Sequence, residues 1–252
     1  LALRLCDLKK CENRENLRIY GELLKANLYR LESGARFAEV DNYYDDMKTV
    51  RIPLDPALSP QKNAVKYFKD YKKTYTAEQM LTRLTEKDRD ELIYFDSVLD
   101  SIARSKTAAD IAEIREELAL AGYIKRQEKR KKNAPAPKLQ EYVSAEGYKI
   151  IVGKNNSQND YLTTSLAAKS DLWFHVKNLP GSHVIVFSHG GEVSDETILK
   201  AARLAALNSK AAASSNTAGD YTPVKYVKKP NGAKPGMVIY TANKTVYVTP
   251  DK

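Results

Sequence analysis

The sequence predicts an α+β fold in which a long antiparallel helical coiled coil with a small inserted α/β tip precedes a compact mixed α+β domain. Leucines recur every seven residues from Leu17 to Leu31, a spacing typical of a helix that packs along another helix. Apolar residues alternate with polar ones between residues 35 and 54, inside this helical region. Alternation, which indicates β-strands, returns from Leu139 onward.

Composition favours a polyanionic partner. The chain has 252 residues, enough for two domains that each bury a core. Its 41 Lys and Arg residues exceed its 32 Asp and Glu residues, which gives a formal net charge of +9. Such a surplus favours binding to nucleic acid or to a membrane surface. No apolar run is long enough to span a membrane.

The first domain is expected over residues 1–133, with two helical arms. One long helix is predicted over residues 1–33 and ends at Gly34, because glycine readily adopts the left-handed conformation that follows many helices. The second arm is predicted over residues 76–124. It opens on Thr76–x–x–Gln79, which has the form of a capping box. Its expected contact stripe is Leu92, Phe95, Leu99 and Ile102.

A second capping pattern lies inside the returning arm. Thr107–x–x–Asp110 predicts the start of another helix, and Gly122 predicts its end. The apolar residues expected on one face of this helix are Ile111, Ile114 and Leu118.

The inserted tip is expected over residues 35–75. A β-hairpin turning at Asp45–Asp46 is followed by a helix that starts at Ser59–Pro60, with Ser as N-cap and Pro at the first helical position. This helix carries aromatic residues beside lysines, which fits either a basic contact surface or ordinary packing with solvated lysines. These residues are Tyr67, Phe68 and Tyr71, with Lys66, Lys69, Lys72 and Lys73.

Residues 125–138 form the expected linker between the domains. A basic run is followed by Ala–Pro–Ala–Pro, a composition that suits a semi-rigid spacer. The basic run fits equally a set of phosphate contacts or a solvated helix end.

The second domain is expected over residues 134–252. One hairpin is predicted around Ala145–Gly147, and another turns at Pro180–Gly181 just after the only tryptophan, Trp173. Ser194 is predicted to cap an alanine-rich helix. Further strands are expected at Val224–Val227, Met237–Thr241 and Thr245–Val248.

Three polar segments of the second domain are candidates for recognition. The amide-rich segment from Gly153 to Asp160 offers both donors and acceptors, although Asx-turns that only shape the loop are the alternative. The second hairpin gathers polar groups at its turn, and residues 225–236 are basic and turn-rich. The candidate nucleic-acid-binding residues are Lys154, Asn155, Asn156, Gln158, Asn159, Asp160, Lys177, Asn178, Ser182, His183, Lys228, Lys229 and Lys234.

The sequence predicts neither catalysis nor a bound metal or other cofactor. His175, His183 and His189 lack the spacing and companion ligands of a zinc site. A triad of Ser182, His183 and Asp160 can be written, but neighbouring residues in sequence do not make triad geometry, and no nucleophile elbow is present.

Five motifs of the chain resemble the NFACT family. Together they cover the second domain, which resembles the NFACT-R module, and the preceding helical hairpin resembles the coiled-coil and middle region of the same family. The matching motifs are Gly153–Asp160, Asp171–His175, Pro180–Val184, Asp220–Thr222 and Val227–Gly236.

The resemblance implies a role in ribosome quality control. It implies binding to obstructed large ribosomal subunits, through rRNA and ribosomal protein, and to tRNA, with recruitment of alanyl-tRNA for template-free alanine tailing. The expected location is the cytoplasm, at the ribosome. The family's N-terminal module is not expected in this sequence, so the chain is expected to act as a binding module and not as an enzyme.

The alternative implied by the same resemblance is a surface adhesin. Members of the family are also named fibronectin-binding proteins, which implies fibronectin as a partner and the cell surface as the location. A basic surface can bind matrix polymers without specificity.

Overall fold

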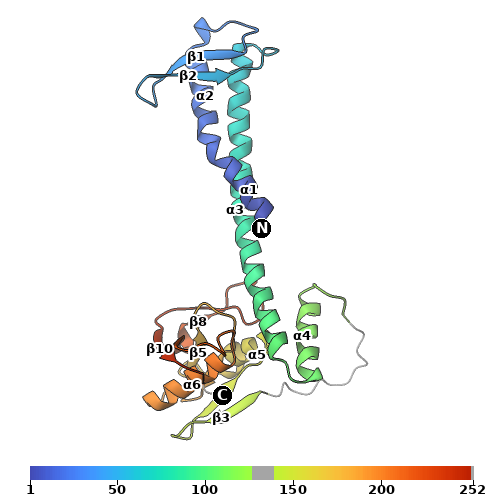
Figure 1. The fold of residues 1–252 in the computed structure, drawn as a ribbon, viewed down its shortest axis with the longest axis vertical. Helices are drawn as coiled ribbons and strands as arrows, with labels where there is room; N and C mark the ends of the chain where they lie inside the picture. Colours follow the sequence, from blue (N-terminus) through green and yellow to red (C-terminus); the bar gives the residue numbers. More distant parts are fainter. Residues whose placement is uncertain (127–138, 251–252) are drawn as a thin grey trace. The chain divides into compact units, whose positions relative to one another are not determined.

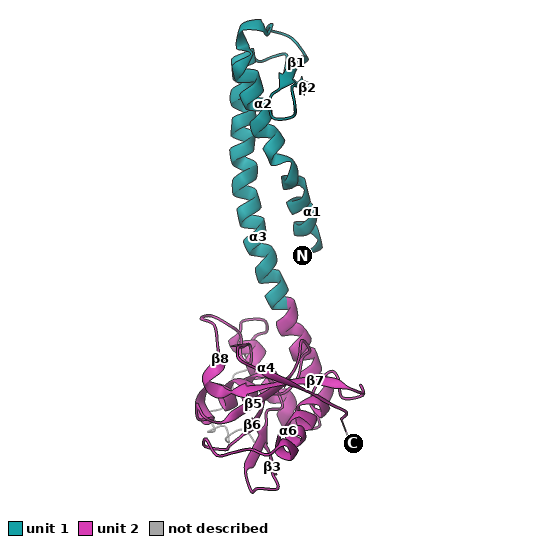
Figure 2. Ribbon diagram, turned by 90° about the vertical axis from the view of Figure 1, so that its left-hand side faces the viewer, with its two compact units in different colours: residues 1–91 teal, residues 92–252 magenta. Residues whose placement is uncertain are grey.

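The computed structural model describes residues 1–126 and 139–250 and confirms the α+β fold class. The chain forms two compact units, Leu1–Glu91 and Leu92–Lys252, shown in teal and magenta in Figure 2. The expected boundary at residue 133 and most of the basic linker, residues 127–138, lie outside the described residues.

The first helical arm is interrupted, in contrast to the single helix predicted over residues 1–33. Helix α1 (Ala2–Lys10) is followed by a 3-10 turn, η1 (Cys11–Asn13), and then by α2 (Arg14–Ala26). After a last 3-10 turn, η2 (Leu28–Arg30), the helical part of the first arm ends. Asn27, whose side chain donates to the Leu23 carbonyl at 2.8 Å, ends α2 well before Gly34, as expected for a residue that competes for backbone hydrogen bonds.

Helix α3 (Pro60–Arg104) is continuous, so the helix start predicted at Thr76 is wrong. The Thr76 hydroxyl donates to the Lys72 carbonyl at 3.1 Å, the bond of a threonine inside a helix. Within the first unit, α1 and α2 run antiparallel to α3 (Figure 1). Two ion pairs, Arg4 with Asp88 and Arg14 with Glu78, and a ring contact of Tyr20 with Tyr67 connect these helices.

The hairpin of the tip is formed as predicted. Strands β1 (Phe37–Asn42) and β2 (Lys48–Pro53) are antiparallel, with Val40 opposite Val50. Their buried face packs on α2 and the start of α3. The Tyr67 hydroxyl donates to the Pro53 carbonyl at 2.7 Å, and the Phe68 ring lies against Gly21. These two aromatic residues therefore pack the tip, while the lysines beside them are exposed.

The second unit is built on a six-stranded antiparallel sheet of order β10-β7-β5-β6-β4-β3. A separate pair, β8 and β9, lies outside this sheet. The strands are β3 (Gln140–Val143), β4 (Lys149–Val152), β5 (Leu172–Val176), β6 (Val184–Val186), β7 (Thr217–Pro223), β8 (Val227–Lys228), β9 (Ile239–Tyr240) and β10 (Lys244–Val248).

Helices cover both faces of this sheet. Residues alternate along a strand, so Phe174 packs under α6 (Asp195–Leu207), whereas Trp173 packs on the opposite face with Leu162. Leu162 opens a π-helical turn, η3 (Leu162–Leu166), that continues the short helix α5 (Asn156–Tyr161). Ser194 caps α6 as predicted, since its side chain accepts from the Thr197 N–H.

Two strand predictions in the second unit need correction. Val224–Tyr226 is a 3-10 turn, η4, and only Val227 and Lys228 continue as a strand. Strand β7 was not predicted, because Gly219, Asp220 and Pro223 disfavour strands locally. Pairing with β5 on one side and β10 on the other stabilises it nonetheless.

Of the stripe predicted on the second half of α3, Phe95 packs inward as expected, whereas the other three residues do not. Leu92, Leu99 and Ile102 are 54%, 64% and 42% exposed, whereas Tyr94 and Val98 are buried. Tyr94 and Val98 contact helix α4 (Ala108–Leu120), which opens on the predicted capping box of Thr107 and Asp110 and buries Ile114. Gly122, with φ of +81°, follows its end as expected.

Glycine is required at position 181 because the backbone there lies close to Ser209, and not because φ is positive. The left-handed residue of the turn between β5 and β6 is Asn178, with φ of 57°. A Cβ on Gly181 would lie 2.7 Å from the Cβ of Ser209, far inside van der Waals contact. The Ser182 N–H, which donates to the Asn208 carbonyl at 2.9 Å, fixes this approach.

Gly181→Ala is expected to destabilise the protein by about 1–3 kcal/mol, because the backbone around Ser209 must shift to admit the methyl group. Gly219→Ala is the matched control, since its nearest neighbour would be 3.4 Å away, and it is expected to change stability by less than about 1 kcal/mol. Urea unfolding measures both, and equal effects would contradict the close-approach explanation.

Candidate nucleic-acid interface

The amide-rich segment forms the start of helix α5 instead of an open loop. Asn155 is the N-cap, and its side-chain oxygen accepts from the Gln158 N–H at 2.9 Å. The Lys154 N–H donates to the Gln158 side-chain oxygen at 3.1 Å. Four amide side chains of this segment are at least 95% buried: Asn155, Asn156, Gln158 and Asn159.

Carboxylates of α4 accept hydrogen bonds from these amides. The Glu113 Oε2 atom accepts from the Asn155 Nδ2 and the Gln158 Nε2, both at 2.7 Å. Asp110, Glu113 and Glu117 are spaced by three and four residues, which places them on one face of α4. The amides therefore attach α5 to α4, and this role differs from the partner recognition expected for them.

Glu117 is the centre of this contact and is only 3% exposed. Its Oε1 accepts from the Tyr94 hydroxyl at 2.8 Å and from the Asn156 Nδ2 at 3.3 Å. Its Oε2 accepts from the Ser157 N–H at 3.2 Å and from the Ser157 hydroxyl at 3.0 Å. Burial, together with the charge of Glu117, raises the pKa of Tyr94, so the phenol remains a donor.

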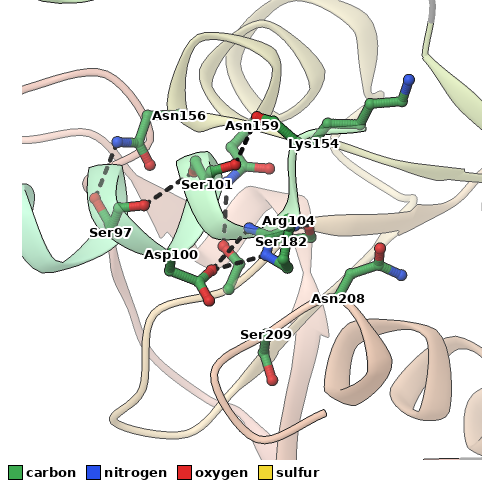
Figure 3. Close-up of polar contacts among 12 residues, drawn as sticks. Ser97, Asp100, Ser101, Arg104, Lys154, Asn156, Asn159, Ser182, Asn208 and Ser209 are labelled. Atoms are coloured by element: carbon green, nitrogen blue, oxygen red, sulfur yellow. Dashed lines mark hydrogen bonds and ion pairs between the residues drawn. The ribbon is translucent and has the colours of Figure 1, made fainter. Parts of the chain in front are cut away.

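Side-chain hydrogen bonds also attach the start of α5 and the turn before β6 to α3. Figure 3 shows Asn156 directed toward Ser97, and Arg104 beside Ser182. The Arg104 guanidinium donates to the Ser182 hydroxyl at 3.2 Å and pairs with Asp100 at 2.8 Å. The Asn159 side chain donates to the Gly181 carbonyl at 3.2 Å and accepts from the His183 N–H at 3.0 Å.

The two histidines of the hairpin are held neutral inside the domain. His183 is 2% exposed, and its Nδ1 lies 2.7 Å from the Thr163 hydroxyl. Burial, followed by the neighbouring His175, holds the pKa of His183 well below its usual range. Burial lowers the pKa of His175 to about 4. Both rings pack on Trp173, with centroid distances of 5.6 Å for His175 and 5.2 Å for His183.

Three of the predicted lysines are held by contacts within the domain. Lys154 lies 3.5 Å from Asp110, and Lys229 pairs with Asp160 at 2.8 Å. Asp160 also accepts from the Gly236 N–H at 3.2 Å. The Lys234 ammonium lies over the ring of Tyr123, 4.6 Å from its centroid, a cation–π contact.

Lys177, Asn178 and Lys228 are the predicted residues that are exposed and not held by a contact within the domain, since Lys229 is exposed but pairs with Asp160. Residues 1–126 and 139–250 contain no hydrogen-bond or ion-pair partner for the side chain of Lys177 or Lys228. The structure thus divides the candidate set into these exposed residues and the buried or internally paired remainder, which includes Ser182 and His183.

A further basic surface lies in the first unit, on the outward face of α3. Lys69, Lys72 and Lys73 line a shallow groove with Thr76 and Met80. These three lysines are exposed, and their side chains have no ion-pair partner within the described residues. Lys69 lies three residues before Lys72 and four before Lys73, a spacing that places these side chains on one side of the helix.

The described residues contain neither a cluster of metal ligands nor a membrane-spanning helix. No group of three or more His, Cys, Asp or Glu side chains there is arranged to hold a metal ion. None of the helices in residues 1–126 and 139–250 is long and apolar enough to cross a membrane.

The carboxylates of α4 and the Arg104 contact were missed from the sequence. The spacing of Asp110, Glu113 and Glu117 was available as a signal for a polar helix face. The partner of this helix face could not be identified from the sequence, because the amides that it binds lie 39 to 45 residues further along the chain.

Two family models match this chain. Residues 6–136 match the family model described as NFACT N-terminal and middle domains, and residues 138–241 match that of the NFACT protein RNA binding domain. The Rqc2 homolog RqcH of Bacillus subtilis is 46% identical over 248 residues, which are 97% of this chain and 43% of the relative. The chain thus spans less than half the length of this relative.

Two streptococcal proteins are also similar. The Rqc2 homolog RqcH of Streptococcus suis is 42% identical over 97% of this chain and 44% of the relative. A solved structure, the C-terminal part of the fibronectin/fibrinogen-binding protein of Streptococcus suis, superposes with a TM-score of 0.70 at 35% identity. It covers 100% of this chain and 91% of that one. The chain belongs to the NFACT family, as a homologue of RqcH that contains the family's RNA-binding domain.

Proposed function

We propose that this chain is the RNA- and ribosome-binding portion of a ribosome quality control factor. The observation that carries the proposal is the match of residues 138–241 to an RNA-binding domain, in a chain with a net charge of +9. The proposed partners are the large ribosomal subunit, through rRNA and ribosomal protein, and tRNA. The proposed location is the cytoplasm, at the ribosome.

The exposed cations suit contacts with phosphates and not with base edges. Lys177 and Lys228 in the second unit, and Lys69, Lys72 and Lys73 in the first, are free to approach a polyanion. Ammonium groups on flexible stems act as point charges that give affinity without reading sequence. Such contacts fit a factor that binds a fixed ribosomal surface and a tRNA.

In this proposal the chain serves the larger reaction by binding. The factor to which it belongs binds obstructed 50S subunits that retain peptidyl-tRNA and recruits alanyl-tRNA for template-free alanine tailing. The described residues contribute docking surfaces to that reaction, and the buried His183 and the amide cluster are occupied by internal contacts.

Co-sedimentation tests the proposal. The chain is expected to pellet with 50S subunits at low salt, and more strongly with subunits that carry peptidyl-tRNA. Binding should weaken steeply as salt rises, because counterions released from phosphates recondense. Failure to bind either 50S subunits or tRNA at low salt would contradict the proposed function.

The double variant Lys177→Ala, Lys228→Ala is expected to lower affinity for tRNA by about tenfold at low salt and to reduce the salt slope by about 1.4–1.8. The pair Lys229→Ala, Lys234→Ala is the matched control, since both side chains are held by internal contacts. Its expected effect is mainly on stability. A larger loss of affinity in the control pair would reverse this assignment.

The alternative function is a surface adhesin that binds fibronectin. It is favoured by the description of the similar Streptococcus suis structure as a fibronectin/fibrinogen-binding protein. An adhesin predicts saturable fibronectin binding that persists at moderate salt and in the presence of RNA. Binding that RNA abolishes would instead indicate generic attraction to a basic surface.

A further inference from the structure

A cavity of about 340 Å³ opens over the sheet of the second unit, near the start of β5 and the end of β7. Leu172 and Pro223, which are paired neighbours on these strands, form part of its lining. Val193, just before the N-cap of α6, and Ile198, in the first turn of α6, line it as well. None of the residues predicted from the sequence as recognition sites lies in this cavity.

Buried polar side chains hold the walls of this cavity. Asp171 has no exposed surface and accepts from the Ala168 N–H and the His189 N–H, both at 2.8 Å. Thr222, equally buried, donates to the Thr241 carbonyl at 3.0 Å. These bonds fix the loops on either side of the opening.

The backbone of the same loops is strained. His189 and Ala242 each have φ of 51°, in the left-handed region that non-glycine residues seldom occupy. Ala242 lines the cavity, and His189 directly precedes a lining glycine, Gly190. Strain of this kind persists only where surrounding contacts enforce it, and it concentrates at ligand sites.

The lining combines an aromatic ring, apolar side chains and a cation. Tyr221 lines the cavity, and its ring is held by stacking on Phe174, 5.3 Å between centroids at an interplanar angle of 15°. Leu172 and Ile198 add apolar surface, and Lys244, opposite Tyr221 on β10, adds a positive charge. Ser170 supplies a hydroxyl.

More positive charge lies next to the opening. Lys169 precedes Ser170, and the Lys225 N–H donates to the Lys169 carbonyl at 3.0 Å, which brings these two exposed lysines together. Of the acids adjacent in sequence to lining residues, Asp171 is buried and its two oxygens already accept backbone N–H donors, whereas Glu192 is exposed between Gly191 and Val193. The part of the edge near Lys169, Lys225 and Lys244, away from Glu192 in sequence, is the part suited to an anion.

We propose that this cavity binds a nucleotide, with the base against Tyr221 and the phosphate near Lys244. Flat aromatic rings beside cations are the means by which proteins hold unpaired bases, and the volume lies in the range of ligand sites. The inference rests on the proposed function and deepens it, because it assigns one unpaired nucleotide of RNA to a specific pocket. A free mononucleotide has the same chemistry.

Photo-cross-linking of the whole chain tests the pocket. The probe is a short single-stranded RNA that contains 4-thiouridine, and mass spectrometry locates the cross-linked peptides. Cross-links are expected on the peptides that contain Tyr221 and Ser170. Ser170→Leu, which fills the cavity from an exposed position, and Lys244→Ala are each expected to lower this yield by about tenfold.

Matched variants and a competitor complete the experiment. Ser165→Leu and Lys200→Ala change exposed residues that do not line the cavity, and both should leave the yield unchanged. Competition by uridine monophosphate would identify free nucleotides as ligands, and its absence would assign the pocket to an RNA strand. Cross-links that all lie elsewhere would overturn the pocket while supporting RNA binding. Absence of any cross-link would contradict both.

Discussion

Glu117→Ala is expected to destabilise the second unit by about 3 kcal/mol. The substitution leaves the Tyr94 hydroxyl, the Asn156 amide and the Ser157 N–H without their shared acceptor in a buried site. Each unsatisfied buried donor costs about 1–3 kcal/mol, reduced where water enters the space left by the side chain. The loss should appear in urea unfolding followed by the fluorescence of Trp173, which is fully buried in this unit.

Two further variants separate the role of Glu117 from a general effect on α4. Arg115→Ala changes an exposed residue of the same helix and is expected to alter stability by less than about 0.5 kcal/mol. Tyr94→Phe removes one donor and keeps the ring, at an expected cost of about 1 kcal/mol. In the double variant with Glu117→Ala the two costs should not add, because the residues share one hydrogen bond.

The sequence correctly predicted the helix caps and the hairpin that depend only on residues close together in the chain. The capping box of Thr107 and Asp110 and the cap at Ser194 were found because each is complete within four residues. The hairpin of β1 and β2 was found from alternation around a short turn. The fold class followed from these elements.

The features that could not be predicted depend on residues far apart in the chain. Strand β7 is specified by pairing with β5 and β10 and not by its own residues. The amides around Asn156 looked available for recognition because their acceptors, Glu113 and Glu117, belong to another helix. Of the candidate residues, Lys177, Asn178 and Lys228 stay available to a partner in the structure.

The largest functional effect is expected from reversing the charge of the α3 groove. Lys69→Glu, Lys72→Glu and Lys73→Glu together should weaken binding to 50S subunits by at least about a hundredfold at low salt, if all three lysines contact phosphates. The slope of log affinity against log salt should fall by about 2–3. The physical reason is the loss of counterion release, with added repulsion between the new carboxylates and the phosphates.

Folding should be preserved in this variant, because the three side chains are exposed and have no ion-pair partner within the described residues. Lys9→Glu, Lys10→Glu and Lys25→Glu form the control, since they make the same change in net charge at exposed positions of α1 and α2. If the proposed surface is correct, the control retains most of its affinity, and thermal unfolding is similar for both. Equal losses of affinity would mean that net charge alone drives binding and would remove the α3 groove from the proposed interface.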